Sequence, residues 1–158
     1  MPNKPLQPTS GDHPSGEGCT LLAPLAADRE RSAAEEWMSL VVSAFWTDPA
    51  TGESCEFTDW EDGHHMAGVE RARTDLWGSG AFRRRGATFL PQLADSDLWV
   101  GPGELPAFVA EVRALLADMD GLRAEMEREE DCTLPHYLAN FLRAAEYAAA
   151  RGGGVMIT

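Results

Sequence analysis

The stretch from Trp99 to Met126 constrains the fold of this chain more than any other segment. Glycines and prolines at 101–106 mark the start of a helix, because the first helical turn contains backbone N–H groups without a partner and so tolerates proline. Apolar residues then recur at spacings of three and four: Leu105, Phe108, Val109, Val112, Leu115, Leu116, Met119 and Leu122. This pattern predicts an amphipathic helix whose apolar stripe must lie on a sheet or on other helices.

The composition indicates a folded, acidic domain. The chain has 158 residues, of which 44% are hydrophobic, and a net charge of −13 at pH 7. This length is sufficient for one domain with a substantial core. A surface this acidic repels nucleic-acid phosphates and anionic membranes, so we expect neither as a partner. The charge suits instead a protein whose partner is basic.

The N-terminal part of the chain differs from the rest. Residues 1–37 are rich in proline and glycine and have no apolar periodicity, so we expect a disordered or mis-annotated extension, followed by a single domain over 38–158. Three cysteines, Cys19, Cys55 and Cys132, are far apart and odd in number, which predicts no disulfide framework and favours the cytoplasm. No run of about 18 apolar residues is present to span a membrane.

Local patterns predict the remaining elements. β-Branched and aromatic residues indicate a strand over 39–46, a returning strand over 54–57 and short strands over 98–100 and 155–158. Helical spacing indicates helices over 66–77 and 133–149 in addition to 105–122, with Thr133 as the cap of the last one. We therefore predict an α+β fold, with a small, mostly antiparallel sheet and three main helices packed on one face.

Side chains of the metal-ligand type gather between Asp59 and His65. The segment contains Asp59, Glu61, Asp62, His64 and His65, and Glu61 and His64 have the E-x-x-H spacing of some metal sites. Adjacent histidines on a helix point about 100° apart, however, so one ion rarely binds both. We assign no metal ligand and keep His64 and His65 as candidates for a metal-binding alternative. No complete catalytic motif occurs, so we predict no catalytic residue and no cofactor.

From about Leu40 to Ile157 the layout resembles small acidic immunity-type proteins encoded beside bacterial polymorphic toxins. The resemblance lies in a short N-terminal strand pair, a segment of the type Phe89-Leu90-Pro91, and a tryptophan before a helix start, here Trp99 and Pro102-Gly103-Glu104-Leu105. An Ala-rich helix, a glycine turn and a terminal strand complete it. The resemblance implies a protein that binds and blocks a toxin, often a basic nuclease. No motif places that family's toxin-contacting residues on this sequence.

These observations lead to a functional expectation and two alternatives. We expect a non-enzymatic, acidic binding protein, an immunity protein that neutralises a basic toxin, because complementary charge speeds encounter and sets orientation. Acidic and aromatic side chains coincide at the candidate contact residues, which are Asp59, Trp60, Glu61, Asp62 and Trp77. The alternatives are a small metal-dependent enzyme that uses the Asp59–His65 cluster, and a self-associating structural module that uses exposed aromatic side chains. The sequence leaves the oligomeric state open.

Overall fold

A computed structural model describes residues 39–57 and 64–158 of the chain. The predicted N-terminal extension lies outside these residues. Within them the order is strand, strand, strand, helical segments, strand, helices and a final strand. The strands are β1 (Ser39–Thr47), β2 (Ser54–Phe57), β3 (Met66–Val69), β4 (Leu98–Val100) and β5 (Gly154–Ile157). The α-helices are α2 (Gly80–Arg84), α3 (Leu105–Ala117), α4 (Met119–Glu125) and α5 (Thr133–Ala149).

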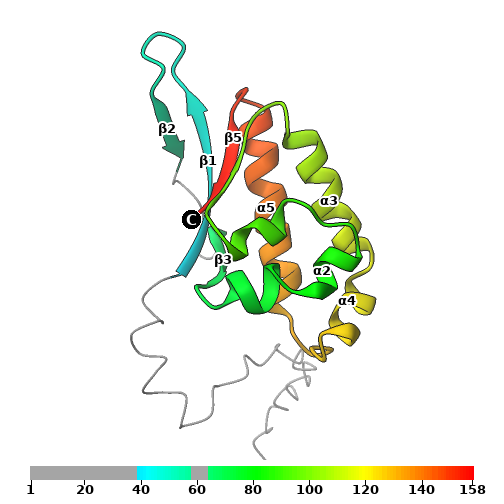
Figure 1. Ribbon diagram of the computed structural model, residues 1–158. Coiled ribbons are helices and arrows are strands. Elements are labelled where there is room, and N and C mark those ends of the chain that lie inside the picture. The colour runs from blue at the N-terminus through cyan, green and yellow to red at the C-terminus, as the bar shows by residue number, and fades with distance from the viewer. Residues whose placement is uncertain (1–38, 58–63) are drawn as a thin grey trace, which may run out of the picture.

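β1 organises the sheet because it is paired along both edges. One edge pairs with β2 and, further toward the N-terminus, with β3; the other edge pairs with the C-terminal strand β5, which in turn pairs with β4. All of these pairings are antiparallel. In Figure 1 the helices of the described chain lie on one side of this sheet. The predicted α+β fold, with its antiparallel sheet covered on one face, is confirmed.

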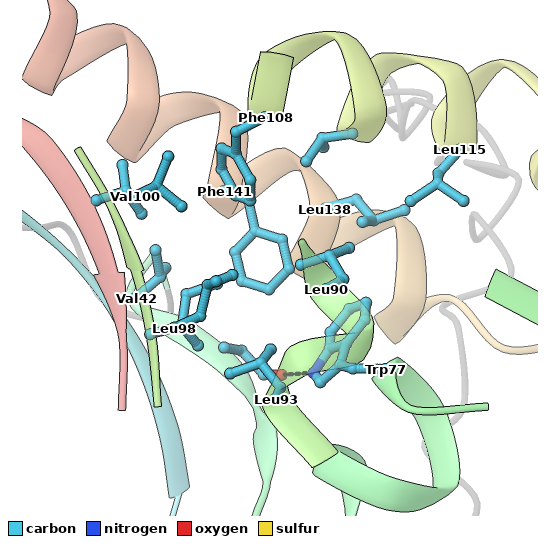
Figure 2. Packing of buried hydrophobic residues seen from close by; sticks show 14 of the residues in the cluster. Val42, Trp77, Leu90, Leu93, Leu98, Val100, Phe108, Leu115, Leu138 and Phe141 are labelled. Atoms are coloured by element: carbon cyan, nitrogen blue, oxygen red, sulfur yellow. Dashed lines mark hydrogen bonds between the residues drawn. The ribbon is translucent and has the colours of Figure 1, made fainter. Parts of the chain in front are cut away.

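The core lies between the helices and the sheet. Along β1, alternate residues Leu40, Val42 and Ala44 are fully buried, as expected for a strand with one face on the core. They face α5, which in turn packs against α3. Phe141 of α5 lies at the centre of the view in Figure 2, between Phe108 of α3 and the residues of the sheet. The stripe predicted from Leu105 onward therefore does supply the core, through Phe108, Val112 and Leu115 among others.

Three local predictions are wrong. The segment predicted as one helix over 66–77 begins as strand β3, because Gly68 has a φ of +121°, which no helix accommodates, and pairs with Leu40. Only its end is helical, as a π-helical turn, η1 (Arg73–Trp77). The long helix is interrupted at Asp118, which leaves the helical conformation and starts α4. The N–H and hydroxyl of Thr133 are bound by the carboxylate of Asp131, so Thr133 is not the cap of α5.

The segment with Pro91 forms a 3₁₀ helix, η2 (Leu90–Ala94), held at its start by Glu111 of α3. The Glu111 carboxylate accepts hydrogen bonds from the N–H groups of Thr88, Phe89 and Leu90, at 2.6, 3.0 and 3.0 Å. Backbone donors at a helical N-terminus have no partner within the helix and favour a negative charge nearby. One side chain thus connects η2 to the main helix.

We expect Glu111→Gln to lower the free energy of unfolding by about 1–2 kcal/mol, because hydrogen bonds to a charged acceptor are about twice as strong as neutral ones. Chemical denaturation monitored by circular dichroism measures this change. Glu129→Gln is the matched control, since Glu129 is exposed and has no hydrogen bond or ion pair among the described residues. Equal stability of the two variants would contradict the assigned role of Glu111.

Candidate functional site

The face of the sheet turned away from the helices carries a pair of aromatic side chains. Phe45 of β1 and Trp99 of β4 lie with their ring centroids 5.4 Å apart and their planes inclined at 59°. Trp99 is 54% exposed and Phe45 is half-buried. Met156 of β5 is paired with Trp99 and with Ser43, so it belongs to the same face. We call the surface formed by Phe45, Glu56, Trp99 and Met156, together with the buried Ser43, the open face.

The aromatic pair depends on a glycine between its two strands. Gly154 of β5 is the register partner of Phe45, and a Cβ atom built on it would lie 2.5 Å from Cζ of Phe45. Because glycine has no side chain, the ring of Phe45 can lie over β5 and reach Trp99. From the sequence, residues 152–154 are predicted only as a glycine turn before a final strand. The packing role of Gly154 could not be read from it.

One side of the open face is uniformly acidic. Residues 39–57 contain Asp48, Glu53 and Glu56 and no lysine or arginine. Glu56 is the register partner of Phe45, and its carboxylate accepts a hydrogen bond from the hydroxyl of Ser43. None of these three carboxylates forms an ion pair with another described residue. The negative charge of this hairpin is therefore available to a partner.

The helical side of the molecule differs, because it contains arginines that form ion pairs with acidic neighbours. All ten arginines of the described residues lie between Arg71 and Arg151. Arg85, for example, binds Asp118 at 2.7 Å and also binds Glu125, which itself contacts Arg84. Hydrogen bonds from Arg85 and Arg84 hold the pKa of the Glu125 carboxyl below its usual value. The arginine run at 83–85 is thus largely occupied by acidic neighbours and gives no basic face for phosphate.

The predicted contact residues do not come together as a described site. Asp59, Trp60, Glu61 and Asp62 lie outside the described residues. Trp77 is completely buried, and its indole N–H donates a hydrogen bond to the carbonyl of Ala67 at 2.9 Å (Figure 2). A partner cannot reach Trp77 in this fold, so its prediction as a contact residue is wrong. Its large, apolar side chain is part of the hydrophobic core.

His64 and His65 lie in the turn before β3, whereas the sequence pattern predicts a helical position for them. Both are half-buried, and the carbonyl of His65 accepts a hydrogen bond from the N–H of Val42 at 2.8 Å. Among the described residues no three or more His, Cys, Asp or Glu side chains are grouped so that they could hold a metal ion. The described residues therefore offer no set of ligands for the metal-binding alternative.

The two described cysteines are in different states. Cys55 of β2 is a free, half-buried thiol. Cys132, which precedes α5, is disulfide-bonded. A disulfide sulfur cannot ionise as a thiolate, so no thiol nucleophile is present at the start of α5.

A second surface feature, an apolar pocket, lies between α3 and α5. It has a volume of about 360 Å³ and is lined by Pro102, Leu105, Pro106, Val109, Arg113, Ala145, Glu146, Ala149, Gly152 and Gly153. Arg113 and Glu146 form an ion pair at 3.8 Å, with both side chains about two-thirds exposed. Local sequence patterns do not predict this pocket, because its lining comes from two helices and a glycine turn that are far apart in the sequence.

Comparison with protein-family models, with curated proteins and with solved structures gave no match. Within the described residues, no helix has both the length and the apolar composition required to cross a membrane.

Proposed function

We propose that this protein is a non-enzymatic, acidic binding protein that neutralises a basic toxin protein by occupying part of its surface, as immunity-type proteins do. The observation that carries the proposal is the open face, where exposed Trp99 and half-buried Phe45 adjoin a hairpin with unpaired carboxylates. Aromatic side chains that are large and rigid supply much of the binding energy of protein interfaces. Unpaired carboxylates beside them accelerate the encounter with a basic partner and repel acidic proteins.

The charge distribution supports a protein partner of this kind over a substrate. The three carboxylates of β1, β2 and their connection are unpaired within the described residues, whereas the helical side has ion pairs along its surface. An acidic hairpin that contains no basic residue attracts an approaching basic protein. The open face is a surface on a sheet and not a cleft, which suits a macromolecule better than a small substrate.

Co-expression tests the proposal. Each protein encoded beside this one in its source genome is produced in a host cell with and without it, and growth is measured. We expect one basic neighbour to be toxic alone, to be tolerated when this protein is present, and to co-purify with it in a fixed ratio. If no neighbour is toxic, or if the toxicity is unchanged by this protein, the proposal is wrong.

A further inference from the structure

We propose that the Phe45–Trp99 pair is an anchor site for an arginine side chain of the basic partner, with Glu56 as the carboxylate that binds the guanidinium end. This inference rests on the proposed function and adds the chemistry of the contact. It follows from three features of the open face: the geometry of the ring pair, the position of Glu56, and the charge of the surrounding hairpin.

The rings of Phe45 and Trp99 are inclined to each other, and Trp99 is exposed over about half of its surface. Two rings at 59° with centroids 5.4 Å apart form an angled surface, and Trp99 exposes 54% of its area. An arginine side chain packs its methylene groups against such an apolar surface while its guanidinium group remains with a polar partner. No described element covers this face, since the helices of the described chain lie on the opposite side of the sheet (Figure 1). The exposed ring is therefore available to a partner.

Glu56 provides the complementary charge beside the rings. As the register partner of Phe45 it projects from the same face of the sheet, at the distance of direct cross-strand neighbours, about 5 Å between Cβ atoms. Its carboxylate is oriented by the hydroxyl of Ser43, and a carboxylate has further acceptor positions. A side chain that lies along Phe45 thus places its end group at Glu56.

These requirements favour arginine over lysine. The guanidinium group is planar, stacks on aromatic rings and binds carboxylates through two parallel N–H groups, whereas the ammonium group of lysine is compact and more strongly hydrated. The hairpin contains no lysine or arginine to compete for the site within residues 39–57. The occupant is accordingly an arginine-bearing segment of a basic protein.

A peptide titration, followed by the ¹⁹F signals of the tryptophans, tests the proposed arginine site without the toxin. The full-length protein is labelled with 5-fluorotryptophan, Trp99 is assigned with Trp99→Phe, and tetra-arginine or tetra-lysine is added at physiological salt. We expect the ¹⁹F signal of Trp99 to shift saturably with tetra-arginine, and tetra-lysine to bind at least threefold more weakly. The signal of buried Trp77 serves as an internal reference and is expected to stay unchanged.

Glu56→Gln keeps the acceptor for Ser43 and removes the charge, so we expect it to weaken tetra-arginine binding at least threefold. Glu129→Gln, which removes one exposed carboxylate from another part of the surface, is the matched control and should leave the affinity unchanged. The inference is overturned if Trp99 does not respond to tetra-arginine, if tetra-lysine binds equally well, or if the two variants behave alike.

Co-expression separates this inference from the proposed function. With a toxic neighbour identified as above, Trp99→Ala and Glu56→Gln are expected to lose protection while both variants keep the melting temperature of the original protein within a few degrees. Full protection by both variants would overturn the anchor site and leave the proposed function standing. A response of Trp99 to tetra-arginine without any toxic neighbour would overturn the proposed function and retain the arginine site.

Discussion

Replacing Gly153 by alanine is expected to abolish the stable fold, with a loss of about 4 kcal/mol or more in the free energy of unfolding. A Cβ atom at this position would lie 2.0 Å from the carbonyl oxygen of Phe45 and 3.1 Å from its carbonyl carbon. Both obstructing atoms belong to the backbone of the central strand, so no change of rotamer relieves the clash. Thermal unfolding followed by circular dichroism measures the effect, and insoluble expression would agree with it.

Gly103→Ala is the control for this prediction. Gly103 has no heavy atom within 4 Å of an added Cβ and does not have a positive φ. The general gain in chain stiffness from a glycine-to-alanine change is therefore present without a clash, and the melting temperature should stay the same or rise slightly. If Gly153→Ala melts within a few degrees of Gly103→Ala, the close approach of the glycine turn to β1 is wrong.

Replacing Trp77 by alanine is expected to lower the free energy of unfolding by about 3–5 kcal/mol, the range for large buried aromatic residues. Trp77 is fully buried and has ring contacts with Phe82 and Phe141, whose centroids lie 5.4 and 5.1 Å away. The change also removes the hydrogen bond to the carbonyl of Ala67 and leaves that buried group without its donor. Urea denaturation of the original protein and of the Trp77→Ala variant measures this loss of unfolding free energy.

Trp99→Ala provides the comparison within the same residue type. Because Trp99 is 54% exposed, we expect its replacement to cost at most about 1 kcal/mol. The two tryptophans thus separate stability from binding: the first should determine whether the protein folds, the second whether it recognises a partner. A Trp77→Ala protein as stable as Trp99→Ala would contradict the described core.

The pattern of apolar residues predicts most of the fold but little about the surface. The stripe from Leu105 onward, the β-branched run of the first strand and the alanine-rich last helix each bury one face, and burial requires a periodicity that is visible in the sequence. The same periodicity misled at 66–77, where Met66 and Val69 fit a helix while the backbone of Gly68 and pairing with the first strand favoured a sheet. Strand pairing between residues more than 20 positions apart produces no local pattern in the sequence, so it cannot be predicted from one.

The open face illustrates what local patterns cannot supply. Phe45 and Trp99 were both recognised as strand residues, but their contact depends on the order of the strands and on Gly154 between them. Acidic residues near Trp77 in the sequence predict a contact residue, but Trp77 is fully buried in the structure. Exposure is a property of the tertiary arrangement, so proximity to charge along the chain is a poor guide to it.

The pairing of the first strand with the last has a consequence for biosynthesis. Val42 and Ile157 are register partners roughly 115 positions apart, and in the described sheet β5 lies between the central strand and β4. Contacts between residues this far apart in the sequence form slowly, because the chain loses conformational entropy in closing the loop before the strands pair. During translation the sheet therefore stays incomplete until the C-terminal residues emerge from the ribosome, and a truncation that removes Val155–Ile157 would leave two unpaired strand edges exposed to aggregation.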